Sequence, residues 1–289
     1  MREVLSEISA LTMRELKHWY RSPFLLVMTF VQPVLWMGLF GKAMNLTGIL
    51  RVPEEVLAQL PPYISSEISA VFNKVISNVF GTPHADYFTF MSVGMPIIVI
   101  LFTSMSSGIS ISWDRRLGFL NKLLVAPVRR GSIILAKVLS GVIRSGVQAA
   151  LVLLVAVAFG AKYVTPHPLM ILVLIGAILL LALGISSLFI LLGIRLKSWE
   201  SQMTLMNLLT LPLMFASNVF YPLDIMPQWL QVVAQLNPLT YAVDLLRQLL
   251  VTGSYENYLF FGELGGLVLF TLSVTFLSVL FAERGLRRD

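Results

Sequence analysis

The chain has 289 residues, of which 57% are hydrophobic and only 12% are charged, and its mean hydropathy is +0.83. A soluble domain carries about 25% charged residues, so this composition excludes a water-soluble globule of the same size. The net charge is +6, and cysteine is absent, which excludes disulfides, thiolate metal sites and cysteine nucleophiles. The three histidines lie far apart in the sequence, so we expect no metal site, because ligands cluster around a metal.

The first 22 residues alternate apolar and charged side chains with a helical period. Val4, Ile8 and Leu11 follow one another at spacings of four and three, which predicts an amphipathic helix over residues 1–22 that lies on the membrane surface. Ser22 and Pro23 are a typical N-cap and first helical residue, so the next helix should begin there.

Six segments are apolar over about 20 residues, the length at which a helix crosses the roughly 30 Å hydrocarbon core of a bilayer. They predict an all-α integral membrane protein that forms a single transmembrane domain over residues 1–289. The six spans are expected at 24–43, 87–113, 133–160, 169–193, 202–220 and 258–282.

The interval between the first two spans contains a further amphipathic helix. Its apolar residues recur with a period of 3.6 from Ile64 to Phe80, and the opposite face carries Glu67 and Lys74. This helix is too polar to span a membrane. It is therefore expected to lie along the membrane surface or to pack on a partner.

Lys and Arg gather in alternate intervals between the spans. Fifteen of the 21 lie at the two ends of the chain, between spans two and three, and after span four; five lie in the other intervals, and Arg144 falls within span three. This asymmetry places both termini in the cytoplasm. An even number of spans, such as six, satisfies that orientation.

The sequence lacks the motifs of a catalytic or nucleotide-binding chain. No G-x-x-x-x-G-K-[ST] loop occurs, and no catalytic triad or pair of acidic residues stands out, so energy for uphill transport would have to come from another chain. Ion-coupled transporters carry charged groups near the middle of the membrane. Here the spans are nearly bare of charge, and Arg144 and Glu263 each lie near the end of a span, which argues against a secondary transporter.

The interval 114–130 between spans two and three combines apolar and basic residues. Leu117, Leu120 and Leu124 form a short apolar stripe, and Pro127 ends the helical pattern. A short amphipathic helix just below the bilayer can dock into a groove on another protein. An ordinary interfacial loop is the alternative.

Two stretches resemble type-2 ABC exporter permeases. The pattern G-F-L-N-K-L-L-x-A-P-x-x-R, from Gly118 to Arg130, resembles their cytoplasmic coupling segment and is closest to the drug-resistance branch, which includes daunorubicin-type exporters. The stretch from Phe220 to Leu250, with the core N-P-L-T-Y-x-x-D-x-x-R, is similar to their segment between spans five and six. The resemblance covers essentially the whole chain, with the same elements in the same order.

The resemblance implies the membrane subunit of a primary active transporter in the plasma membrane of a prokaryote, and not an enzyme by itself. Two permease copies, as a homodimer or a heterodimer, would form the pathway, and two separate ABC ATPase subunits would bind ATP and Mg²⁺. Residues 1–22 would be the connecting or elbow helix, and this chain would hold no cofactor. The residues expected to contact the ATPase are Asp114, Arg116, Gly118, Leu120, Asn121, Leu124, Pro127 and Arg130.

The same resemblance implies a substrate cavity and an external gate. Spans two and five line the cavity in related exporters, and helix packing is the alternative explanation for their polar residues; the residues expected there are Phe102, Ser106, Asn207, Thr210 and Met214. The segment between spans five and six would re-enter the outer leaflet as a gate, or form a rigid plug. Its expected residues are Pro222, Asn237, Pro238, Tyr241, Asp244 and Arg247.

The sequence leaves several transported substrates possible. The expected function is export of a lipophilic drug-like compound or a lipid from the cytoplasm or the inner leaflet, and the nearest alternative is export of a lipid-linked glycan by the same machinery. An ion-coupled secondary transporter, a scaffold and a polytopic membrane enzyme are the alternatives from other classes.

Overall fold

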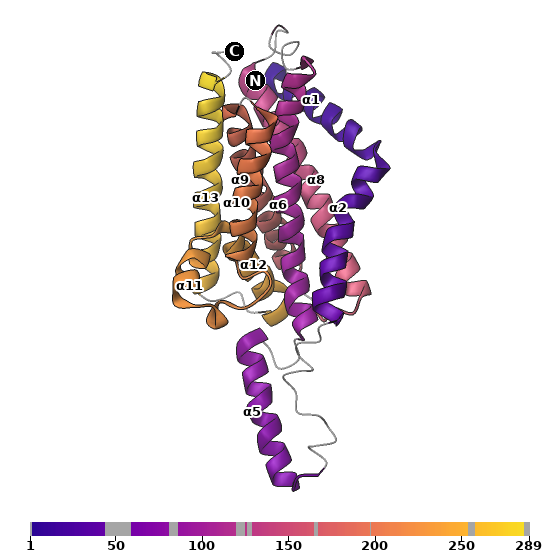
Figure 1. The fold of residues 1–289 in the computed structure, drawn as a ribbon, viewed down its shortest axis with the longest axis vertical. Coiled ribbons are helices and arrows are strands. Elements are labelled where there is room, and N and C mark those ends of the chain that lie inside the picture. Colours follow the sequence, from indigo (N-terminus) through magenta and orange to yellow (C-terminus); the bar gives the residue numbers. More distant parts are fainter. Residues whose placement is uncertain are drawn as a thin grey trace.

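The computed structural model describes residues 2–43, 59–80, 86–119, 125, 129–164, 167–196, 198–253 and 258–285. These residues form helices joined by turns, and no strand occurs among them, as the all-α prediction required. The long helices stand side by side in a bundle, with α1 (Arg2–Tyr20) at one end and α11 (Gln228–Gln235) toward the other (Figure 1).

Four of the described helices are long and apolar enough to cross a membrane, and they match predicted spans two, three, four and six. They are α6 (Tyr87–Arg116), α8 (Arg130–Ala158), α9 (Pro168–Arg195) and α13 (Tyr258–Gly285). α6 is the central helix, because 89% of its most apolar stretch of 18 residues is buried inside the chain, whereas the corresponding share for α13 is 17%. The core of the bundle is therefore built around α6.

The first and fifth predicted spans correspond to shorter helices. α2 (Pro23–Trp36) continues as a π-helix, η1 (Met37–Ala43), and α10 (Trp199–Phe215) has 17 residues. The helical residues of α10 overlap the predicted span 202–220 and are displaced toward the N-terminus. Ser198 caps the start of α10, and the Asn237 side chain donates to the carbonyls of Leu213 and Ala216 at its end. The bounds of the fifth span stay a prediction. A count of six spans stays a prediction.

Glycine allows the backbones of α6 and α9 to touch. A Cβ on Gly108 would lie 2.5 Å from the carbonyl oxygen of Phe189, and a Cβ on Gly193 would lie 2.7 Å from the carbonyl oxygen of Gly108. Any side chain at these two positions would force the helices apart. The close approach fixes how α9 sits on the central helix.

Four short elements lie between α10 and α13, at the end of the bundle away from α1 (Figure 1). They are η2 (Leu223–Ile225), α11, α12 (Pro238–Arg247) and the π-helix η3 (Gln248–Thr252). The turn between α8 and α9 is held at the same end. Tyr163 shares a 2.8 Å hydrogen bond with Ser92 of α6, and the backbone N–H of Val164 donates to the carbonyl of Leu250 at 2.7 Å. Burial raises the pKa of Tyr163 to about 12, so its phenol stays protonated.

The two amphipathic helices of the sequence form at opposite ends. α1 packs along α8, and α5 (Pro62–Phe80) extends beyond the other end of the bundle, along its long axis (Figure 1). Both helices expose large apolar side chains. On α1, Leu5 is 65% and Met13 is 62% exposed, and on α5, Tyr63 is 68% and Val71 is 61% exposed. The placement of either helix on a membrane surface stays a prediction.

Candidate functional site

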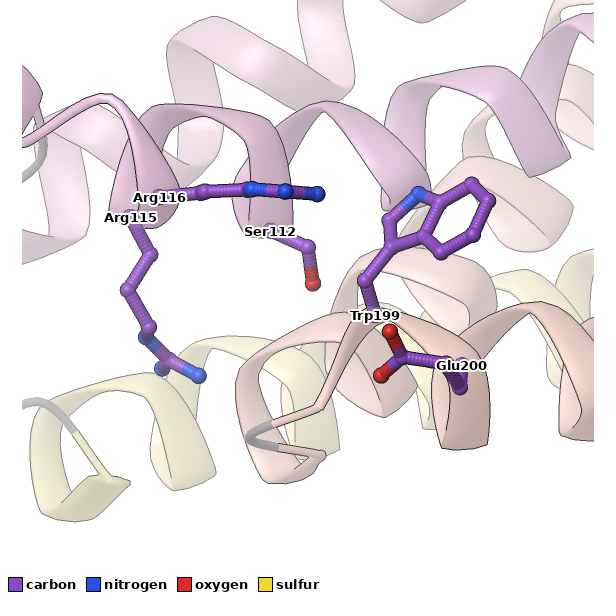
Figure 2. Close-up of a pocket in the computed structure, with 5 residues that line it drawn as sticks. All are labelled: Ser112, Arg115, Arg116, Trp199 and Glu200. Atoms are coloured by element: carbon purple, nitrogen blue, oxygen red, sulfur yellow. The ribbon is translucent and has the colours of Figure 1, made fainter.

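The last turn of α6 carries two arginines with different roles. Arg115 donates from Nη1 to the Leu196 carbonyl at 3.1 Å and from Nη2 to the Ile194 carbonyl at 3.4 Å, so it caps the C-terminus of α9. Arg116 is exposed and makes no hydrogen bond or ion pair with another residue of the described ranges. Both line a cavity of about 330 Å³ (Figure 2), together with Ser112, Trp199 and Glu200.

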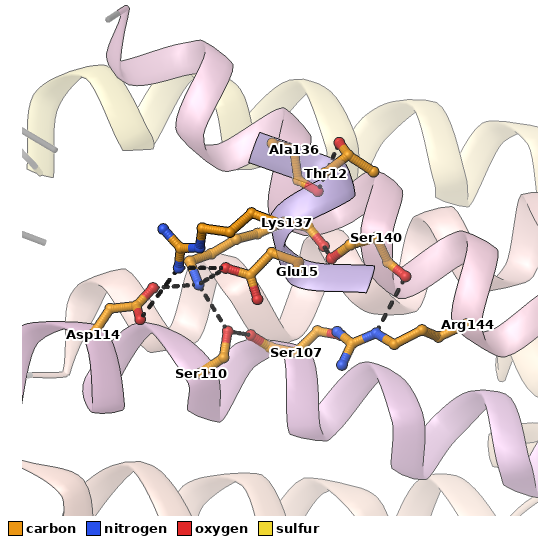
Figure 3. Close-up of polar contacts among 10 residues, drawn as sticks. Thr12, Glu15, Ser107, Ser110, Asp114, Ala136, Lys137, Ser140 and Arg144 are labelled. Carbon is orange, nitrogen blue, oxygen red and sulfur yellow. Dashed lines mark hydrogen bonds and ion pairs between the residues drawn. The ribbon is translucent and has the colours of Figure 1, made fainter. Parts of the chain in front are cut away.

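A buried ion cluster joins α1, α6 and α8 at this end of the bundle (Figure 3). Lys137 of α8 is 4% exposed, and its Nζ lies 2.5 Å from Oδ2 of Asp114 and 3.4 Å from Oε1 of Glu15. Arg14 completes the cluster, since its Nη2 lies 3.0 Å from Glu15 and 4.0 Å from Asp114. Three chain segments that are far apart in sequence are therefore tied by two cations and two carboxylates.

Hydrogen bonds extend the cluster along α6 and α8. Lys137 also donates to Oγ of Ser110 at 3.0 Å. Two helical turns further along α8, Arg144 donates from Nη2 to Oγ of Ser107 at 2.9 Å (Figure 3). Arg144 therefore points toward α6, where its guanidinium is hydrogen-bonded, and also donates from Nε to the Ser140 carbonyl at 3.2 Å.

The predicted coupling segment begins where this cluster ends. Gly118 follows α6 with a φ of +70°, a conformation that glycine adopts without strain, and the guanidinium of Arg14 lies 3.7 Å from the centroid of the Phe119 ring. Leu117 is 73% exposed and Val125 is 88% exposed. Apolar side chains thus point away from the bundle on this connection.

The coupling residues expected from the sequence are only partly described. Asp114 is in the ion cluster, Arg116 lines the cavity, Gly118 forms the turn, and Arg130 is the first residue of α8. The remaining four lie outside the described residues: Leu120, Asn121, Leu124 and Pro127. The contact of this segment with an ATPase stays a prediction.

The five residues expected in the substrate cavity divide into two groups. Thr210 and Met214 are 2% and 3% exposed and face the interior, where Oγ1 of Thr210 donates to the Met206 carbonyl at 2.7 Å. Ser106 and Asn207 are exposed on the surface of the single chain, and Phe102 is half-buried. Packing alone explains Thr210 and Met214, whereas Ser106 and Asn207 put polar atoms on an apolar helical surface.

Arg247 is the centre of the predicted external gate. It is 8% exposed, and its Nη2 donates to the carbonyls of Asn218 at 2.6 Å and Val219 at 3.2 Å. Its guanidinium lies 3.5 Å from the centroid of the Phe90 ring, and its Nη1 lies 3.9 Å from Oδ1 of Asp244, which accepts a hydrogen bond from Asn218. These contacts fasten α12 to the turn after α10 and to the start of α6.

The other residues of the predicted gate also have structural partners. Asn237 caps α12 by accepting from the backbone of Leu239 at 3.0 Å, while its Nδ2 donates to the carbonyls of Leu213 at 2.8 Å and Ala216 at 2.7 Å. Pro222 and Pro238 are buried, and Tyr241 packs against Gly266 of α13. The segment is thus tightly attached to the bundle; its role as a gate stays a prediction.

Sequence reasoning missed Glu15 and Lys137, which were not among the expected site residues. In the sequence Glu15 is one charge among several on the amphipathic helix, and Lys137 is one of the basic residues near the membrane. The signal that could have found Lys137 is its place four residues inside a predicted span, because a cation there needs a partner. Only the fold identifies that partner.

Comparisons with known proteins agree on one family. The family described as ABC-2 type transporter matches residues 6–251. A protein of Cyanophora paradoxa named as the transport permease ycf38 is 30% identical over 271 residues, which cover 93% of this chain and 82% of that protein. The linearmycin resistance permease protein LnrN of Bacillus subtilis is 26% identical over 194 residues, 67% of this chain and 49% of that protein. The daunorubicin resistance ABC transporter permease protein DrrB1 of Streptomyces coeruleorubidus is 22% identical over 183 residues, 62% of this chain and 63% of that protein.

Proposed function

This chain belongs to the ABC-2 type transporter family, and on that premise we propose that it is the permease subunit of an ATP-driven exporter for a lipophilic drug-like compound or a lipid. The family and the transport permeases among its relatives support the general function. The class of cargo rests on two relatives named as resistance permeases, for linearmycin and for daunorubicin. The cargo would leave the cytoplasm or the inner leaflet of a prokaryotic plasma membrane.

The proposed orientation puts the α1 end of the bundle in the cytoplasm. The start of α1 and the last turns of α13 lie at this same end (Figure 1), and the intervals that reach it carry most of the Lys and Arg. Six crossings require α2 with η1, and α10, as the remaining two spans. The 17 residues of α10 stand at the lower limit of about 17 for a spanning helix.

The observation that carries the proposal is the pair of exposed apolar side chains on the connection between α6 and α8. Leu117 and Val125 are 73% and 88% exposed, and they lie at the proposed cytoplasmic end, beyond the membrane. Exposed apolar groups flanked by arginines suit docking into a groove of a partner. We assign that partner as an ABC ATPase, which would bind the ATP and Mg²⁺ that this chain does not.

A second copy of a permease would complete the pathway. Ser106 of α6 and Asn207 of α10 are exposed on helices whose other exposed side chains include Leu208 and Leu211, at 64% and 53%. Polar side chains at membrane depth favour a protein neighbour or a cavity over lipid. The proposal is that this α6–α10 face meets its counterpart in a homodimer or a heterodimer, with the cargo path between them.

The test is ATP turnover by the candidate ATPase, reconstituted in liposomes with the full chain. Val125→Asp puts a charge where the proposal needs an apolar contact, so it should abolish both association with the ATPase and the modulation of its turnover. The matched control is Tyr63→Asp on α5, which changes an exposed side chain of similar accessibility (68%) at the opposite end. Control and parent chain should behave alike.

Either of two results would overturn the ATPase assignment. One is that no ATPase associates with the parent chain. The other is that Val125→Asp and Tyr63→Asp leave turnover equally unchanged, which would remove the role of the α6–α8 connection and reopen the secondary-transporter alternative.

A further inference from the structure

The cavity at the end of α6 is lined mainly by hydrogen-bond donors. Arg115 and Arg116 come from the last turn of α6, and Trp199 and Glu200 come from the first turn of α10. In Figure 2 the Arg116 side chain extends along α6 toward the indole of Trp199. The volume of about 330 Å³ lies at the small end of the roughly 300–1,000 Å³ typical of ligand pockets.

Two of these donors have no hydrogen-bond partner among the residues that the structure describes. Nε1 of Trp199 is buried and makes no hydrogen bond, and the guanidinium of Arg116 pairs with no residue in the described part of the chain. Glu200 lines the same cavity without an ion pair to either arginine. The hydroxyl of Ser112 donates to Gln202, so it is not a free donor. A buried donor without an acceptor is costly, so Nε1 of Trp199 favours an acceptor atom in this space. The exposed guanidinium of Arg116 favours an acceptor that carries a negative charge.

The two arginines have different roles in the cavity. Arg115 donates two hydrogen bonds to the carbonyls at the end of α9, so it stabilises the helix end that borders the cavity. Arg116 keeps its planar set of donors, the geometry that binds a phosphate through two parallel hydrogen bonds. With one carboxylate against two guanidinium groups, the lining carries a net positive charge.

The surroundings of the cavity are those of a membrane interface. Trp113 and Trp199 meet edge to face with ring centroids 6.3 Å apart, and Trp113 is 45% exposed; tryptophan prefers the headgroup level of a bilayer.

We propose that this cavity binds the phosphate headgroup of an anionic phospholipid from the inner leaflet. The inference rests on the proposed orientation, which puts the α1 end at the cytoplasmic surface, and it needs no contact with an ATPase. Basic cavities between membrane helices on the cytoplasmic side suit such headgroups. The ligand chemistry is a phosphate with a net negative charge, and the membrane level of the tryptophans favours a lipid over a soluble phosphate.

The experiment is lipid titration of the purified full chain, followed by native mass spectrometry, with no ATPase or ATP present. Phosphatidylglycerol is the anionic probe, phosphatidylcholine the zwitterionic one, and inorganic phosphate the soluble one. Phosphatidylglycerol should bind more tightly than phosphatidylcholine, and inorganic phosphate at the same concentration should not displace it.

Two substitutions in the cavity should act in opposite directions. Arg116→Gln removes a charged donor and should weaken phosphatidylglycerol binding about tenfold. Glu200→Gln removes a repulsive carboxylate and should strengthen it roughly twofold to fivefold. The matched control is Lys17→Gln, which removes one exposed positive charge from α1 outside the cavity and should leave binding unchanged.

The opposite signs separate a binding site from a loss of structure, because a damaged bundle would not bind the anionic lipid more tightly. Equal affinity for the two lipids would overturn the proposal. So would an Arg116→Gln chain that binds like the Lys17→Gln chain. Displacement by inorganic phosphate would overturn the lipid assignment. The lipid titration contains no ATPase, so a negative result in the ATPase assay would not change its outcome. The lipid-binding proposal and the ATPase-coupling proposal can therefore be refuted independently.

Discussion

Replacing Lys137 by methionine is expected to destabilise the end of the bundle where α1, α6 and α8 meet. The Nζ atom lies 2.5 Å from Asp114 and 3.4 Å from Glu15, and the lysine side chain is 4% exposed. Methionine keeps an apolar stem of similar length and removes the charge. Two carboxylates, each on a side chain that is 15% exposed, then lose the cation that lies between them.

The expected cost follows from the geometry of the cluster. Removing one partner of a buried ion pair costs about 3–5 kcal/mol. Arg14 stays near both carboxylates, 3.0 Å from Glu15 and 4.0 Å from Asp114, so we expect about 3 kcal/mol, the lower end of that range. By the scaling for domains of 150–250 residues, this corresponds to a drop of roughly 6–12 °C in the apparent melting temperature.

The assay is thermal unfolding of the purified full chain in detergent. Lys17→Met is the matched control, because Lys17 is exposed on α1 and lies outside the cluster. The double variant Asp114→Asn/Lys137→Met should cost less than the sum of its single variants by about 0.5–3 kcal/mol, since residues in contact are coupled. Strict additivity, or a Lys137→Met chain as stable as Lys17→Met, would refute the argument that the ion cluster joins the three helices.

Three further substitutions test the contacts that shape the bundle. Gly108→Ala places a Cβ 2.5 Å from a backbone oxygen of α9 and should cost about 1–3 kcal/mol; Gly176→Ala, where a Cβ meets nothing within 4 Å, should be neutral or stabilising in the same unfolding assay. Arg247→Met removes the donor to the carbonyls of Asn218 and Val219, so amide hydrogen exchange over residues 217–228 should accelerate; unchanged exchange would mean that Arg247 does not hold this segment. Tyr163→Phe deletes the 2.8 Å hydrogen bond to α6 and should lower the free energy of unfolding by about 1 kcal/mol, with no loss as the contrary result.

The membrane class and most helices could be predicted from the sequence because their cause is local. The segment Pro168–Arg195 is apolar at nearly every position, and a soluble fold of this size could not bury such a helix from water on all sides. Helix starts are local as well: Asp86 caps α6, which begins at Tyr87, the first residue of the predicted second span. The end of α10 at Phe215 is not local, because the Asn237 side chain, 24 residues beyond Leu213, donates to the carbonyl of Leu213.

The predicted site residues were chosen by resemblance, and their surroundings were beyond the reach of the sequence. Thr210 and Asn207 are one helical turn apart on α10, yet one is buried and the other exposed. The periodicity of a wholly apolar helix does not show which face meets protein, because lipid and protein interiors are equally apolar. Packing against α6 makes that distinction.

The sequence by itself determined that this is a helical membrane protein. It also determined which intervals between the helices carry most of the Lys and Arg, and where the connection between α6 and α8 lies. Each of these follows from the transfer of local segments between water and lipid. Only the tertiary structure decided that Glu15, Asp114 and Lys137 form one cluster, and that Arg116 and Trp199 face one cavity. Such contacts join residues as much as 122 positions apart, and they arise when long helices pack in one register. No local preference encodes that register.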